Sequence, residues 1–190
     1  MNIYDPYPDE VEVDGAIYRL NMSYDRVLRV IDLQEAPDLL TEDRLELQAR
    51  LLLADEADCP PDTQTQLQVV LAALALLPKP DEDEQGERYI DFHQDAALIR
   101  SAFFRIGVDL TRDFIHINQF LELLSDLPSD TALMRVIDIR RRPIPKATRD
   151  NGEQIAALMK AKSRVAIRMS EEERRVRFAK SLKQSQVLRG

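Results

Sequence analysis

Apolar residues recur at helical spacing through three consecutive segments between residues 91 and 142. In each segment the apolar positions are three or four residues apart, so they share one face of a helix. Turn residues separate the segments. Gly107 follows the first, where a left-handed C-terminal cap would lie, Pro128 closes the second, and Ser129 and Asp130 are candidate caps for the third. The three predicted faces comprise Ile99, Ala102, Phe103 and Ile106; Ile117, Phe120, Leu121 and Leu124; and Leu133, Val136 and Ile137.

A β-hairpin is predicted before these helices, at about residues 10–20. Apolar and charged residues alternate on either side of Asp14-Gly15, and such a pair between alternating segments is the strongest short hairpin signal. A lone hairpin is marginally stable in water, so we expect this one to lie against the helices.

Three more helices are expected between the hairpin and residue 78. Ser23 and Thr41 are favourable N-caps for the first two, which run to about Gln34 and Asp55. The third, Thr63–Leu77, is apolar on nearly every side after its first turn. Such a helix is typically buried all round, so we predict it to be the central buried helix.

The C-terminal part of the chain predicts basic helices with narrow apolar stripes. Pro143-Ile144-Pro145 is an extended break, and residues 150–168 have helical propensity. A capping box at Ser170–Glu173 opens a last helix. We therefore predict a mainly α protein, with a compact helical domain at 1–142 that carries the small N-terminal hairpin, and a basic helical tail at 143–190.

Charge is distributed unevenly along the 190 residues, whose net charge is −8. Residues 1–100 carry 8 basic and 23 acidic side chains, whereas residues 139–190 carry 15 and 5. An acidic body joined to a basic tail suggests that the tail meets an anionic partner or folds back on its own body.

No pattern of catalytic, metal-binding or cofactor-binding residues stands out. Cys59 is the single cysteine, and neither His93 nor His116 has a second ligand at zinc spacing, so both histidines are predicted to be surface or capping residues. An acidic loop begins like a calcium loop at Asp81, but its twelfth position is Phe92, which cannot bind a cation. We therefore expect no enzyme activity, no cofactor and no metal. The chain shows no secretory signal or membrane-spanning run, which predicts a cytosolic protein.

The basic residues at the end of the predicted domain and in the tail are the candidate partner surface. They could contact phosphates, or they could belong to an amphipathic helix that docks on a protein. We favour protein docking, because few aromatic residues are interleaved and the acidic body repels nucleic acid. The candidate residues are Arg140, Arg141, Arg142, Arg174, Arg175, Val176, Arg177, Phe178 and Leu182.

The order of these elements resembles the bacteriophage gp-fifteen family of siphophage tail-assembly proteins. The resemblance covers roughly residues 10–142, although this chain lacks the tryptophan that the family usually has near Ile117 and Asn118. The matching pieces are Ala102-Phe103, Gly107-Val108-Asp109-Leu110, Leu127-Pro128-Ser129-Asp130-Thr131 and Ile137-Asp138-Ile139-Arg140.

The resemblance implies a tail-assembly chaperone in the cytoplasm of the bacterial host. Its partners would be the tape-measure protein, other tail proteins and an upstream chaperone chain. The alternative is a nucleic-acid-binding phage accessory protein that uses the basic tail. No membrane partner is expected.

Overall fold

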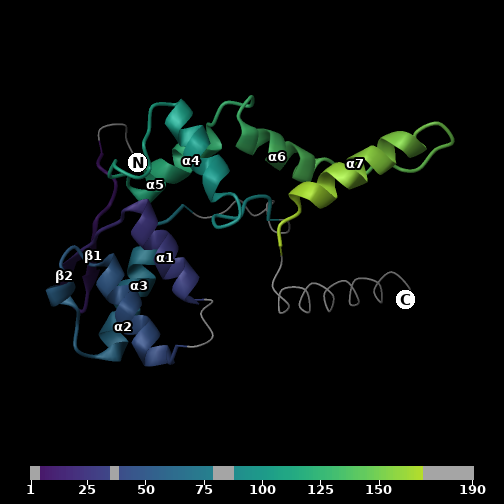
Figure 1. Ribbon diagram of the computed structural model, residues 1–190. Helices are drawn as coiled ribbons and strands as arrows, with labels where there is room; N and C mark the ends of the chain where they lie inside the picture. Colours follow the sequence, from purple (N-terminus) through teal and green to yellow (C-terminus); the bar gives the residue numbers. More distant parts are fainter. Residues whose placement is uncertain (1–4, 35–38, 79–87, 169–190) are drawn as a thin grey trace, which may run out of the picture. The chain divides into compact units, whose positions relative to one another are not determined.

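The structure, a computed structural model, describes residues 5–34, 39–78 and 88–168. Across these ranges the chain forms seven α-helices, one 3-10 helix and one two-stranded antiparallel sheet (Figure 1). The prediction of a mainly α protein with a small N-terminal hairpin is therefore confirmed. The predicted helix that begins at Ser170 lies outside the described residues.

The chain divides into two compact units. Unit 1 comprises residues 1–85 and 103–127, and unit 2 comprises residues 86–102 and 128–190. The predicted domain boundary after Arg142 stays a prediction.

Unit 1 contains the hairpin and five helical elements. Its hairpin closes through Asp14 and Gly15, whose φ angles of 51° and 79° are those of the tight turn that an Asp-Gly pair predicts. The inward residues Val11 and Val13 are buried, and β1 packs against α3, as a hairpin of marginal stability requires. The elements are β1 (Glu10–Val13), β2 (Ala16–Arg19), α1 (Tyr24–Gln34), α2 (Thr41–Leu52), η1 (Glu56–Asp58), α3 (Thr63–Ala75) and α5 (Ile117–Ser125).

Stacked aromatic rings form the centre of the core of unit 1. Phe120 lies with its ring centroid 4.8 Å from that of Tyr24 and 5.0 Å from that of Phe103. Both phenylalanines are almost completely buried, as the apolar stripes predict. Gln48 ties two helices together, since its side-chain amide donates to the Val30 carbonyl at 2.9 Å.

Helix α3 is buried on one face only, so the prediction of an all-round buried helix is wrong. Leu67 is 41% exposed and Leu71 is 58% exposed. The reason is that α3 packs against α2 and β1, and these contacts leave Leu67 and Leu71 exposed. The residues that α3 buries are Gln66, Val69, Val70 and Ala73.

Helix α4 (Ala96–Arg105) supplies residues to both units, and α6 (Ala132–Arg141) and α7 (Gly152–Val165) belong to unit 2. Gly107 has a φ of 85°, as the predicted left-handed cap requires. The cap of α6 is Thr131, whose hydroxyl accepts from the Met134 N–H at 3.2 Å. Thr131 therefore takes the role that we predicted for Ser129 or Asp130.

None of the helices in the described ranges is both long and apolar enough to cross a membrane.

Candidate functional site

The predicted partner surface is only partly within the described residues. Arg174, Arg175, Val176, Arg177, Phe178 and Leu182 lie outside them. Arg140, Arg141 and Arg142 are described, at the C-terminal end of α6. These three consecutive arginines have three different environments.

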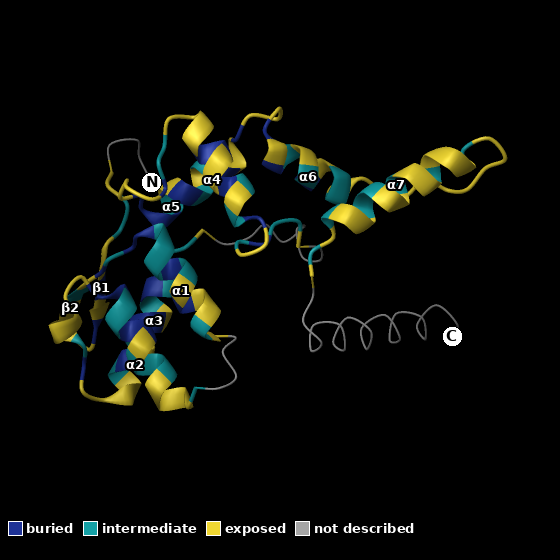
Figure 2. Cartoon of the chain, viewed as in Figure 1, coloured by how far each residue is buried: buried dark blue, intermediate teal, exposed yellow. Residues whose placement is uncertain are grey.

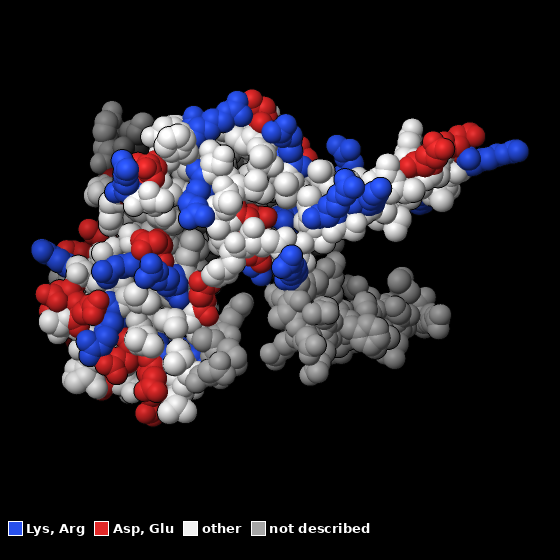
Figure 3. All heavy atoms as spheres, in the orientation of Figure 1, with Lys and Arg blue, Asp and Glu red and all other residues white. Residues whose placement is uncertain are grey.

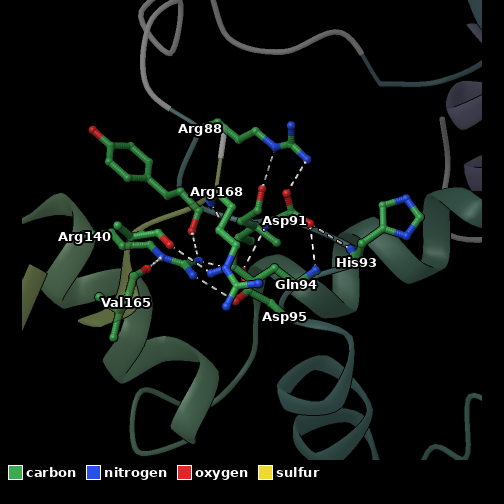
Figure 4. A network of polar contacts seen from close by, with 11 residues as sticks. Arg88, Asp91, His93, Gln94, Asp95, Arg140, Val165 and Arg168 are labelled. Carbon is green, nitrogen blue, oxygen red and sulfur yellow. Dashed lines mark hydrogen bonds and ion pairs between the residues drawn. The ribbon is translucent and has the colours of Figure 1, made fainter. Parts of the chain in front are cut away.

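Arg140 is an internal residue, bound to Asp95 by a two-pronged ion pair (Figure 4). Its Nη1 lies 2.5 Å from Asp95 Oδ2, and its Nη2 lies 2.9 Å from Oδ1. The side chains of Arg140 and Asp95 are only 7% and 3% exposed. Arg140 also donates to the carbonyls of Tyr89, at 2.8 Å, and Val165, at 2.6 Å. A planar guanidinium suits such a site because its donors form a rigid fork.

The turn that leads into α4 positions Asp95 for this pair. The Asp95 side chain accepts from the Asp91 N–H at 3.0 Å, and the Asp91 carboxylate accepts from the N–H groups of His93 and Gln94 at 2.9 and 2.7 Å. Arg88 adds an ion pair to Asp91 at 2.8 Å. Burial raises the pKa of the Asp91 carboxyl, but the backbone donors of Gln94 and His93 and the charge of Arg88 outweigh it, so the pKa lies below its usual value. Asp91 is therefore a charged cap that fixes the turn.

The same turn and α6 hold the end of α7 mainly through polar contacts. Lys162 donates to the Arg140 carbonyl at 2.6 Å. Gln94 donates to the Ala166 carbonyl at 2.9 Å and accepts from the Arg168 N–H at 2.9 Å (Figure 4). No residue of α7 is buried, whereas α1, α2, α3 and α5 of unit 1 all have buried residues (Figure 2). Helix α7 is therefore attached to α6 by hydrogen bonds and a half-covered apolar face.

The other two arginines of the triplet are at the surface of unit 2. The Arg141 guanidinium lies 5.3 Å from the centre of the Tyr89 ring, within the range of a cation–π contact. Arg142 is exposed. They belong to a larger basic surface, because the described residues of unit 2 carry 12 basic and 6 acidic side chains. Lys and Arg side chains gather over α6 and α7 in Figure 3.

Sequence reasoning did not identify the partners of Arg140. Asp95 and Tyr89 lie 45 and 51 residues before it, and nothing in the helical periodicity links such distant positions. The one local signal was Asp91, because aspartate is a preferred capping residue before a helix. In the parts of the chain that the structure describes, no group of three or more His, Cys, Asp or Glu residues could hold a metal ion.

Comparison with protein families assigns the chain by sequence. Neither a comparison with curated proteins nor one with solved structures found a protein similar to it. Residues 3–167 match the family described as Bacteriophage Gp15 protein. Because the match covers most of the 190 residues, including the whole hairpin and all seven described helices, this chain belongs to the bacteriophage Gp15 family.

Proposed function

We propose that this phage protein is a tail-assembly chaperone that binds the tape-measure protein of a siphophage before the tail tube polymerises. The role in tail assembly is what the resemblance to the family implies. The structural observation that supports binding to a protein is helix α7, an amphipathic basic helix with no buried residue. Exposed apolar surface beside charged side chains is typical of a surface that docks another chain.

The apolar stripe of α7 can serve both its own unit and a partner. Ile155, Leu158 and Val165 are half-buried, whereas Met159 is 55% exposed. Methionine is flexible and polarizable, so it adapts to varied apolar partners. A tape-measure helix would cover this stripe, with its own charged residues against the basic surface. Tube subunits would later replace the chaperone.

The chaperone works in the host cytoplasm without chemistry, in this proposal. Burial raises the pKa of the lone thiol, Cys59, which favours the unreactive protonated form. The partners would be the tape-measure protein, other tail proteins and an upstream chaperone chain.

Nucleic-acid binding is a second candidate function, because unit 2 has a basic surface. Its surplus of basic side chains could contact phosphates. The two functions differ in their dependence on apolar residues. Protein docking requires Met159 and the predicted tail residues Val176, Phe178 and Leu182. Phosphate binding requires charge and weakens steeply with added salt.

A pair of matched substitutions on α7 separates these functions. Met159→Lys removes an exposed apolar side chain, whereas Gln154→Lys adds the same charge at an exposed position elsewhere on the helix. Tape-measure fragments are mixed with each full-length protein, and their aggregation is followed by light scattering. We expect the unsubstituted protein and Gln154→Lys to suppress aggregation, and Met159→Lys to suppress it much less.

The same proteins are titrated with duplex DNA at about physiological salt. Tight, salt-sensitive DNA binding that both lysine variants strengthen, with no effect on tape-measure aggregation, would replace the chaperone proposal with the nucleic-acid one. A variant with serine at Val176, Phe178 and Leu182 tests the tail in the same two assays.

A further inference from the structure

Helix α3 carries an apolar face that the described residues of unit 1 leave uncovered. We call Leu67, Leu71 and Leu74 the leucine face. They are spaced four and three residues apart, so they lie in one row, about 10 Å long at 1.5 Å per residue. Leu67 is 41% exposed, Leu71 is 58% exposed and Leu74 is half-buried. No charged residue occurs anywhere in α3.

The leucine face differs from the exposed side of an ordinary surface helix. Exposed helix positions are usually filled with charged residues, and a helix that is apolar all round is normally buried. In α3 the opposite face already fills the core, through Val69, Val70 and Ala73, which are at most 3% exposed. The leucine face therefore adds apolar surface that the core of unit 1 does not use.

Carboxylates dominate the elements that pack against α3. The two elements that pack against α3 are α2 and β1. Glu42 and Asp43 are exposed on α2, and Glu10 and Glu12 are exposed on β1. Over residues 10–19 and 39–78 together, ten carboxylates stand against three arginines. Two of these arginines, Arg19 and Arg50, are already paired with carboxylates of the same surface.

We propose that the leucine face is a docking site for an amphipathic helix of another protein whose apolar stripe is flanked by lysine or arginine. Leucines in a row at helical spacing fit the stripe of such a helix, and the carboxylates fit its basic flanks. A nucleic acid or an anionic membrane does not fit, because the carboxylates of α2 and β1 repel both. This site lies in unit 1, apart from the residues that the proposed function uses. It rests on the proposed function only in that its natural occupant would be a segment of the client.

Designed helical peptides test the chemistry of the occupant directly. Three probes of equal length are titrated against the full-length protein by fluorescence anisotropy: one with a leucine stripe and lysine flanks, one with the same stripe and glutamate flanks, and one with lysine flanks and serine in place of the leucines. We expect the first to bind at least about tenfold more tightly than either of the others.

Substitution of the leucine face locates the binding. Leu67→Gln with Leu71→Gln removes two exposed leucines, and the control Ile144→Gln makes the same kind of change at a 52% exposed residue of unit 2. The double variant should keep its thermal midpoint and bind the leucine–lysine peptide about ten- to a hundredfold more weakly, whereas the control should bind it normally. Equal binding by the double variant, or equal binding of the lysine-flanked and glutamate-flanked peptides, would overturn this inference.

The peptide and aggregation assays together distinguish failure of the docking site from failure of the proposed function. If the double variant loses the peptide but still suppresses tape-measure aggregation, the leucine face is a docking site for a helix other than the client. If the unsubstituted protein binds the peptide but never affects tape-measure fragments, the proposed function fails while the docking site stands.

Discussion

Unit 1 is held together by an apolar core, whereas unit 2 depends on a buried ion pair. Of the 23 buried apolar residues in the described ranges, nineteen belong to unit 1 and four to unit 2. Unit 2 instead buries Asp95 with Arg140 and attaches α7 without burying any of its residues. Apolar burial is non-directional, but a buried ion pair stabilises only while both partners and their geometry are present. A single substitution or a change of charge should therefore destabilise unit 2 more easily than unit 1.

The two units also differ in charge. The described residues of unit 1 carry 18 carboxylates and 7 arginines, whereas those of unit 2 carry 6 acidic and 12 basic side chains. Their surfaces thus suit partners of opposite charge.

Loss of the ring at the centre of unit 1 should have the largest effect. Phe120 is 1% exposed and stacked against two other aromatic rings. Phe120→Ala should lower the free energy of unfolding by about 3–5 kcal/mol, because it leaves a cavity in a close-packed core. The control Phe104→Ala removes the same ring at a 71% exposed position and should cost less than about 0.5 kcal/mol. Chemical denaturation measures both, and an unchanged midpoint for Phe120→Ala would contradict this description of the core.

Breaking the ion pair should destabilise unit 2 by about 3 kcal/mol, since the remaining buried charge has no counterion. Asp95→Ala leaves Arg140 uncompensated, and hydrogen exchange of the amides of α6 and α7 should report the loss locally. The double variant Asp95→Ala with Arg140→Met should recover part of it, because neither charge remains. If the separate effects of Asp95→Ala and Arg140→Met simply add in the double variant, the two side chains do not stabilise unit 2 as a pair.

We expect His116 to make the stability of unit 1 depend on pH. Its Nδ1 accepts from the Asn118 N–H at 3.1 Å and so caps α5, and its Nε2 lies 3.3 Å from the Pro8 carbonyl, to which it donates in this tautomer. Burial lowers the pKa of His116, although the Pro8 carbonyl and the carboxylates of Asp9 and Glu122 oppose the shift. The neutral form is therefore the one that the fold stabilises.

The lowered pKa of His116 determines whether stability rises or falls with pH. The stabilisation is complete above the ordinary histidine pKa of about 6.5, and it is lost as the pH falls below that value, because the unfolded chain then takes up a proton more readily. His116→Asn keeps a capping side chain without a titratable ring. Between about pH 7.5 and pH 5.5 the unsubstituted protein should lose more thermal stability than this variant. Parallel losses would show that other groups cause the pH dependence.

The sequence predicted turns and helix caps correctly because these features depend on residues close together in the chain. The Asp14-Gly15 turn, the glycine cap at Gly107 and the capping role of His116 each follow from residues within a few positions. Errors arose where long-range packing decides. The apolar pattern of α3 could not reveal that only one of its faces has neighbours, because periodicity carries no information on how many elements surround a helix.

Local patterns indicate the environment of each candidate arginine less well than the fold, for the same reason. A triplet of arginines indicates a basic surface, yet whether a particular arginine faces solvent depends on a carboxylate far along the chain. Arg140 meets Asp95 inside unit 2, whereas Arg142 is exposed. The predicted boundary after Arg142 likewise follows from a local break at two prolines, while the hydrogen bonds of Lys162 and Val165 to Arg140 cross it.

Removing everything after Arg142 should have the smallest effect on unit 1. Among the described residues, α7 and the three residues after it form hydrogen bonds with Arg140 and Gln94, both in unit 2, and α7 buries no side chain. Distant sites without shared partners contribute independently, so a chain ending at Arg142 should stay folded and soluble, with the unfolding free energy of unit 1 within about 0.5 kcal/mol of its full-length value. Amides at the start of α4 should exchange faster, because Arg140 loses Val165 as a partner while keeping Asp95. Denaturation followed by near-ultraviolet absorption of the Tyr24 and Phe120 rings, together with hydrogen exchange, measures both parts. Aggregation of the shortened chain, or loss of the transition of unit 1, would show that the segment after Arg142 is an integral part of the core and that the predicted boundary is wrong.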